Sequence, residues 1–241
     1  MFLERKKVLV FSAHAADFCS RAGGTIARLA DAGARVHIHG LSYGENCESP
    51  ALWARDPVPS RERIKDIRKE EIQAAAALVG ASVDCFDFGD SPLLLDQGRR
   101  LQIIDAIRAF QPDLILTHWV DDILHPDHVE ATQAVIWGAR YCGVPGIETE
   151  HPPCAAAELV CYEAQLGTGP VTKFLPEFYV DISATIERKL EALKKLAAQP
   201  PLPEQYEILA RYRALEAQIT ANMSACRFAE GFCRIGTEAV H

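Results

Sequence analysis

Short apolar, β-branched segments alternate with segments of helical periodicity along this 241-residue chain. Strands are predicted at residues 7–12, 36–41, 83–88, 112–118, 156–163 and 178–182. Helices are predicted at residues 23–33, 61–78, 102–110 and 128–141. Such alternation is typical of parallel strands joined by crossover helices. We therefore expect an α/β fold, a Rossmann-like three-layer sandwich with a mostly parallel sheet.

Helical patterns dominate the remaining sequence, at residues 183–198 and 204–219. With 49% hydrophobic residues, the chain has the size and composition of one large α/β domain. We expect a single domain over 1–241, with a Rossmann-like core at 1–180 and a helical C-terminal segment at 181–241.

The overall charge and the cysteine pattern limit the classes of partner. The formal net charge of −8 argues against a nucleic-acid-binding surface, which usually carries a basic face. The apolar run at residues 8–11 is too short for a signal-peptide core, and no later run approaches the roughly 18 apolar residues of a membrane span. The eight cysteines show no zinc-finger or thioredoxin spacing, which favours reduced thiols. We expect a cytoplasmic protein with no nucleic-acid partner and no membrane partner.

Two polar clusters follow predicted strands that are far apart in the sequence. His14 and Asp17 follow the first strand, and His125 and His128 follow the strand at 112–118. In an open parallel sheet, ligands bind outside the carboxyl ends of the strands, so both clusters should meet at one edge. Imidazole and carboxylate are ligands that Zn²⁺ prefers, and a catalytic site keeps about three protein ligands. His14, Asp17 and His128 meet that count, which makes a metal-assisted reaction of water the leading hypothesis.

Simpler explanations exist for each of these residues. A histidine at a strand-to-loop turn, such as His14, is more often a satisfied polar residue than a ligand. Asp127 follows a proline at the start of a predicted helix, where an aspartate commonly caps the helix. The grouping of His118, His125 and His128 within eleven residues raises the probability of a metal site.

Further motifs accompany the two clusters, namely Gly23-Gly24-Thr25, Gly44-Glu45, Arg68-x-x-Glu71 and Val180-Asp181-Ile182-Ser183. With them, nearly the whole chain resembles the PIG-L (LmbE-like) family of zinc-dependent N-deacetylases. The resemblance implies a homo-oligomer with one Zn²⁺ per subunit, held by His14, Asp17 and His128. It also implies that His125 is a catalytic histidine and that Asp127 orients the second motif.

The chain departs from this family at the position of the general base. The family's deacetylases usually carry Ala-His-Pro-Asp-Asp-Glu, in which the first Asp deprotonates the attacking water, whereas this chain has Ala15, Ala16 and Phe18 in place of Pro, that Asp and Glu. A methyl group accepts no proton, and loss of a positioned base costs about a hundredfold to ten-thousandfold in rate. The usual deacetylase mechanism therefore does not suit this chain.

Within the family, the chain is similar to the 4-oxalomesaconate hydratases of bacterial gallate catabolism, which add water across a carbon–carbon double bond. This resemblance implies a zinc-dependent hydro-lyase that converts 4-oxalomesaconate to 4-carboxy-4-hydroxy-2-oxoadipate. Two alternatives stay open: a zinc-dependent N-deacetylase of an N-acetylated sugar conjugate with a relocated base, and a catalytically silent metal-binding protein.

The replacement base must come from another strand end. Glu45 and Glu48 lie in the loop after the second strand, and we expect Glu48 to be the base, although a solvated loop carboxylate is an equally good explanation of that residue. Glu45 is expected to contribute to substrate binding or to the structure of the loop. His125 would be the complementary acid or oxyanion partner, because imidazole donates or accepts a proton near neutral pH.

An anionic polycarboxylate substrate needs a cation in its binding site. Arg68, at the family's arginine position, is the first choice, and Arg21, Arg55 and Arg61 are weaker candidates. The acidic net charge does not exclude such a substrate, because a local positive pocket with its metal dominates at short range. We expect the partner of this protein to be a small anionic molecule.

Overall fold

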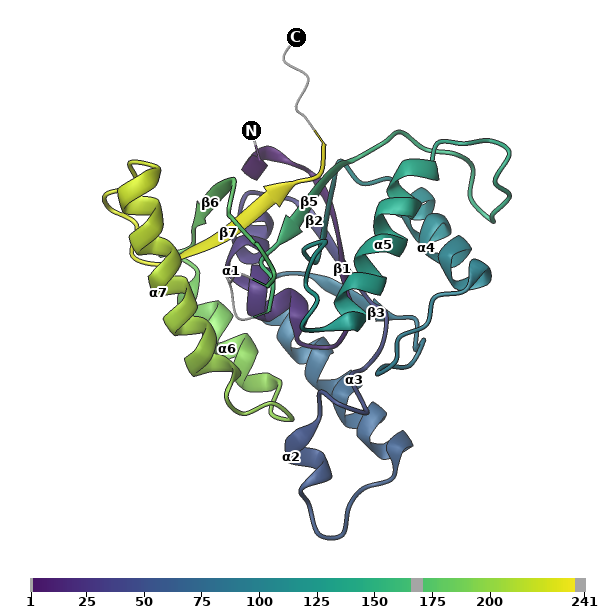
Figure 1. Cartoon of the computed structure of the whole chain (residues 1–241), viewed down its shortest axis with the longest axis horizontal. Coiled ribbons are helices and arrows are strands. Elements are labelled where there is room, and N and C mark those ends of the chain that lie inside the picture. The colour runs from purple at the N-terminus through teal and green to yellow at the C-terminus, as the bar shows by residue number, and fades with distance from the viewer. Residues whose placement is uncertain (1, 166–170, 237–241) are drawn as a thin grey trace.

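A seven-stranded sheet runs through the centre of the molecule in the order β3-β2-β1-β4-β5-β7-β6 (Figure 1). The computed structural model describes residues 2–165 and 171–236. Five neighbouring strands are parallel, namely β3 (Ser82–Cys85), β2 (Arg35–Gly40), β1 (Lys7–Ser12), β4 (Leu114–Thr117) and β5 (Glu158–Tyr162). The strand β7 (Ala229–Arg234) pairs antiparallel with β5 and with β6 (Phe178–Asp181). The expected mostly parallel sheet is confirmed.

Helices cover both faces of this sheet. They are α1 (Asp17–Asp31), α2 (Pro50–Trp53), α3 (Arg61–Leu78), α4 (Gln97–Phe110), α5 (Pro126–Tyr141), α6 (Ile186–Lys195) and α7 (Leu202–Thr220), with the 3₁₀ helix η1 (Phe2–Glu4) before β1. Side chains alternate along a strand, so Val8 and Val10 pack with α1, α3, α6 and α7, whereas Leu9 and Phe11 pack with α4 and α5. The molecule is therefore a three-layer α/β/α sandwich, as expected. None of the helices in 2–165 and 171–236 combines the length and the apolar character needed to cross a membrane.

The start of α1 differs from the expectation. The helix begins at Asp17, whereas the paired glycines suggested a start near Gly23. Both glycines lie inside the helix, where a Cβ on Gly24 would come within 2.7 Å of Ile182. These glycines therefore allow α1 to approach the chain after β6 closely, and they do not mark a helix end. The earlier start places Asp17 in the first helical turn.

The C-terminal segment also needs a correction. Residues 181–241 were expected to be helical, but β7 lies between α7 and the end of the described chain and inserts between β5 and β6. Its sequence holds Glu230 and Gly231, so it shows neither an apolar run nor a clean alternation. Residues 237–241 of this expected segment lie outside the described residues.

Candidate functional site

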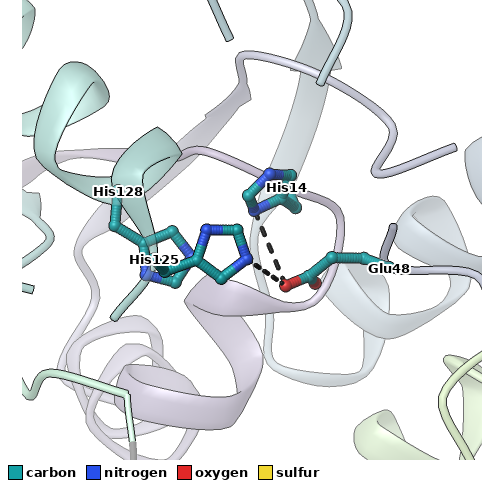
Figure 2. A group of neighbouring side chains, drawn as sticks. All are labelled: His14, Glu48, His125 and His128. Atoms are coloured by element: carbon teal, nitrogen blue, oxygen red, sulfur yellow. Dashed lines mark hydrogen bonds and ion pairs between the residues drawn. The ribbon is translucent and has the colours of Figure 1, made fainter. Parts of the chain in front are cut away.

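The two polar clusters meet at the carboxyl edge of the sheet because their strands are neighbours. Parallel pairing of β1 with β4 sets Val10 beside Leu116, so the chain leaves both strands at the same edge. His14 follows β1, while His125 is the N-cap residue of α5 and His128 lies in its first turn. Figure 2 shows that these three imidazoles and the carboxylate of Glu48 converge.

The expected ligands lie around the carboxylate of Asp17. His14 Nδ1 is 3.4 Å from Asp17 Oδ2, and His128 Nε2 is 3.4 Å from Asp17 Oδ1. Glu48 Oε1 lies 3.8 Å from His14 Nδ1, and ligand atoms of His14, Glu48, His125 and His128 all lie within 4.8 Å of one another. The structure thus brings His14, Asp17 and His128 together, and it adds Glu48 and His125 as neighbouring donor groups.

Hydrogen bonds to the outer nitrogens leave the inner imidazole nitrogens free for a cation. His14 Nε2 donates to Asp127 Oδ2 at 3.1 Å, and His128 Nδ1 donates to Asp122 Oδ2 at 2.7 Å. His14 Nδ1 and His128 Nε2 are buried and have no hydrogen-bond partner. Metal-bound histidines commonly donate their second N–H to a carboxylate in this way. These residues therefore fit a divalent metal ion with imidazole and carboxylate ligands.

His118 has a different role from the other histidines of the cluster. Its Nε2 accepts a hydrogen bond of 2.9 Å from the backbone N–H of Ala13, so this nitrogen has no free lone pair. Burial and the neighbouring His128 hold the pKa of His118 well below its usual range, which keeps the ring neutral. The ring stacks on His128 at a centroid distance of 4.0 Å and supports that residue.

Asp127 contacts His14 of the first polar cluster, whereas it was expected to orient the second cluster, which contains His125 and His128. It accepts the hydrogen bond from His14 described above, and it accepts backbone N–H groups from Ser91 at 2.7 Å and Leu93 at 2.9 Å. Asp127 does not cap α5, because His125 is the N-cap residue. Asp122, which fixes His128, was missed by the sequence reasoning. The one signal for it is its place in an acidic pair six residues before His128.

Glu48 faces the histidine cluster from the loop after β2. His125 Nε2 donates to its Oε1 at 3.1 Å, and Gln199 Nε2 donates to its Oε2 at 2.9 Å. Burial acts to raise the pKa of Glu48, but His14 beside it and the hydrogen bond from His125 lower that pKa to about 2. The side chain is therefore a carboxylate that already contacts an imidazole.

The turn at Gly44 allows Glu48 to reach the site. Gly44 has a φ of +67°, which favours glycine, and a Cβ there would lie 2.9 Å from the Cβ of Glu48 and 3.3 Å from that of His14. A larger residue would push Glu48 away from His14. Glycine is therefore required at the first position of the Gly44-Glu45 motif by the left-handed backbone and by the close approach of Glu48 and His14.

Arg68 and Glu45 do not lie where the sequence analysis expected them. Arg68 is fully buried, and its guanidinium donates to Glu71, to the carbonyl of Tyr43 and to Gln199 Oε1. Glu45 is 2% exposed, with Oε1 3.6 Å from Lys65 Nζ. Neither residue lines the cavity described next, so the expectation that they bind substrate is corrected. Arg68 instead fixes the amide of Gln199, which holds Glu48.

A cavity of about 610 Å³ opens beside the cluster. Asp17 and Glu48 line it where it adjoins the histidines, and residues of α7 form much of its remaining wall. Ala16, at the position of the missing family base, also lines it. Arg21, from α1, lies in this wall too, whereas the other two expected cations, Arg55 and Arg61, are exposed on the surface.

Comparison with known proteins assigns the chain to a family. The PIG-L profile, described as GlcNAc-PI de-N-acetylase, matches residues 9–138. The chain is 32% identical to 4-oxalmesaconate hydratase of Pseudomonas putida over 94% of this chain and 88% of that protein. It is 29% identical to diacetylchitobiose deacetylase of Thermococcus kodakarensis over 95% of this chain and 83% of that protein.

The fold is similar to that of a solved structure over nearly the whole chain. The crystal structure of GalB, the 4-carboxy-2-hydroxymuconate hydratase of Pseudomonas putida KT2440, superposes with a TM-score of 0.91 at 30% identity. The match covers 98% of both chains, so the sheet and its helices are shared throughout. With the profile match and these near full-length similarities, the chain belongs to the PIG-L family.

Proposed function

We propose that this protein is a metal-dependent hydratase that adds water to the carbon–carbon double bond of 4-oxalomesaconate, giving 4-carboxy-4-hydroxy-2-oxoadipate in gallate catabolism. One observation carries this function. The carboxylate beside the candidate ligands comes from Glu48 in the loop after β2, whereas the position at which the family's deacetylases carry their base holds the methyl group of Ala16. Similarity to a hydratase over nearly the full length supports the same reaction.

The name of the similar hydratase and the name of the similar solved structure, both from Pseudomonas putida KT2440, refer to the same substrate. 4-Carboxy-2-hydroxymuconate is the enol tautomer of 4-oxalomesaconate, so both names describe one tricarboxylate. We propose that His14, Asp17 and His128 hold one Zn²⁺ per subunit. When bound, this ion would supply a Lewis acid for oxygens at the keto or enol carboxylate end of the substrate, and in the enol tautomer it would polarise the conjugated system.

Glu48 and His125 would divide the two proton transfers. Glu48 takes a proton from water while the water oxygen forms a bond to one alkene carbon. His125 gives a proton to the other alkene carbon, so that the double bond is consumed and both new bonds are accounted for. The hydrogen bond of 3.1 Å between the two side chains then returns the proton from Glu48 to His125 and restores the starting state.

A zinc-dependent N-deacetylase of an N-acetylated sugar conjugate is the second candidate. The 29% identity to a diacetylchitobiose deacetylase favours it. It requires Glu48, from the loop after β2, to replace the family base that is missing at Ala16. A silent metal-binding protein is disfavoured, because His125 and Glu48 form a hydrogen-bonded acid–base pair beside the candidate ligands.

Assays with two substrates distinguish the three candidate functions. Zinc-loaded protein is given 4-oxalomesaconate while its conjugated ultraviolet absorbance is followed, and N-acetylglucosamine derivatives while amine release is followed. The proposed hydratase removes the absorbance and releases no amine. Amine release without loss of absorbance would establish the deacetylase, and no reaction with either compound would favour the silent protein.

We also propose that the protein acts in the cytoplasm as a homo-oligomer on a free anionic small molecule. The family resemblance supports this assembly. Light scattering coupled to size-exclusion chromatography measures the subunit number, and a single 26.5 kDa species would contradict the proposed assembly.

A further inference from the structure

We propose that Arg21 is a carboxylate-binding residue of the substrate cavity, which restricts the substrate to molecules with a further carboxylate beside the reacting end. This inference deepens the hydratase function above and rests on it. Nothing in the family motifs described above includes Arg21 as a substrate contact.

The cavity wall carries negative charges, so binding of an anionic substrate requires a cation in that wall. Asp17 and Glu48 place two carboxylates at the end near the histidines. Among the residues that form the described wall, Arg21 is the one with a permanent positive charge. A polycarboxylate in this cavity would meet repulsion from these two carboxylates, which a metal can offset for one carboxylate of the substrate, but a further carboxylate needs another partner. Arg21, which lines the cavity and pairs with Asp17, is the residue that can supply it.

The guanidinium of Arg21 has one edge free of protein partners. Its Nη1 donates to Asp17 Oδ1 at 2.6 Å and to Ser20 Oγ at 3.2 Å. Nε is buried without a hydrogen-bond partner, and Nη2 donates to no atom of residues 2–165 and 171–236. These two nitrogens share one edge of the planar group, an edge of the kind that binds a carboxylate with two parallel hydrogen bonds, and a small rotation of the side chain would have to expose the buried Nε for both bonds to form.

The surroundings of Arg21 favour a fixed orientation. The side chain is 5% exposed, and the ring of Tyr206 in α7 lies 5.9 Å from its guanidinium carbon. Asp17 precedes Arg21 by one helical turn in α1, so the ion pair connects the candidate metal end to the guanidinium. A buried donor without a partner is costly, and a bound carboxylate would satisfy it. A neutral N-acetyl sugar offers no such group.

Binding of an inert tricarboxylate tests this assignment without requiring turnover. Isothermal titration of zinc-loaded protein with tricarballylate compares the wild type with Arg21→Met and Arg21→Lys. Arg211→Met is the matched control, because Arg211 is an exposed arginine of α7 that pairs with Glu207 and does not line the cavity. The trimethyl ester of tricarballylate tests whether the charge is needed. Zinc content is measured for every variant.

We expect the dissociation constant for tricarballylate to rise at least tenfold in Arg21→Met and at least threefold in Arg21→Lys, with zinc retained. Arg211→Met should bind as the wild type does, and the ester should bind to none of the proteins. Wild-type affinity in Arg21→Met overturns the inference, and wild-type affinity in Arg21→Lys does so if the first variant fails to fold. Tricarballylate binding that depends on Arg21, in a protein that does not hydrate 4-oxalomesaconate, would retain the carboxylate site and refute the hydratase function.

Discussion

Each proposed imidazole ligand has its tautomer set by one carboxylate. Asp127 holds His14 and Asp122 holds His128, so in both residues the nitrogen that faces Asp17 has no hydrogen-bond partner. Sequence reasoning could propose His14, Asp17 and His128, because residue types and strand ends are visible in the sequence. It could not assign Asp122 or the target of Asp127, because a hydrogen-bond partner depends on how two loops face each other.

Removal of Asp122 should weaken metal binding without emptying the site. Loss of a carboxylate behind a ligating histidine typically costs about 10- to 100-fold in metal affinity. We expect Asp122→Ala to show a loss of this size in a competition titration against a chelator. Asp121→Ala is the matched control, because Asp121 is exposed and adjacent. Equal affinities of the two variants would remove Asp122 from the metal site.

Replacement of Glu48 distinguishes a role as the general base from a role as a metal ligand. If Glu48 is the base, Glu48→Ala lowers kcat for hydration at least about tenfold while zinc content stays at the wild-type level. Both quantities are measured on the same preparation. An unchanged rate would remove Glu48 from the mechanism, whereas a loss of zinc would make it a ligand.

The loop after β2 carries Glu48 into the site through the turn at Gly44. Alanine in the left-handed region costs about 1–2 kcal/mol in stability at any such position. At Gly44 it must also displace the Glu48 side chain, whereas a Cβ at Gly33, with φ of +84°, meets nothing within 4 Å. We expect Gly44→Ala and Gly33→Ala to lose similar stability in urea denaturation, but only Gly44→Ala to lose hydration activity. Equal activities would contradict the positioning of Glu48 by this turn.

Some elements could be predicted from their own sequence and others could not. The observed bounds of β1 and α3 equal the predicted ranges 7–12 and 61–78. The strand contains an uninterrupted apolar run, whereas α3 has a helical period and begins after a capping serine, Ser60, whose hydroxyl accepts the N–H of Arg63. The start of α1 was predicted too late, because Gly23 and Gly24 suggest a helix end when the element that packs against them is not known.

The C-terminal elements complete the sheet and the cavity of the whole molecule. Glu230 of β7 accepts backbone N–H groups of Gly24 and Thr25 and pairs with Lys189 of α6 at 2.7 Å. Because a charged residue occupies this buried position, the sequence of β7 does not show the apolar pattern by which a strand is recognised. The wall formed by α7 was likewise not predictable, because its amphipathic pattern does not reveal which part of the sheet edge it faces.

The buried pair of Lys189 and Glu230 should stabilise the whole fold. Removal of one partner leaves an uncompensated buried charge, which typically costs about 3–5 kcal/mol. We expect Glu230→Leu to lower the free energy of unfolding by this amount in urea denaturation, and Lys189→Met combined with Glu230→Leu to recover most of the loss. A single variant as stable as the wild type would show that the pair does not tie β7 to α1 and α6.

The central claim is that the ends of β1 and β4 build one metal centre on which hydration of 4-oxalomesaconate depends. The most direct measurement is the initial rate of absorbance loss as Zn²⁺ is added to chelator-treated protein, for the wild type and for His128→Ala. The wild type should be inactive without metal and should reach its full rate at one equivalent of Zn²⁺, whereas His128→Ala should neither retain zinc nor gain activity. Full hydration by the metal-free wild type, or stoichiometric zinc in His128→Ala, would contradict the account.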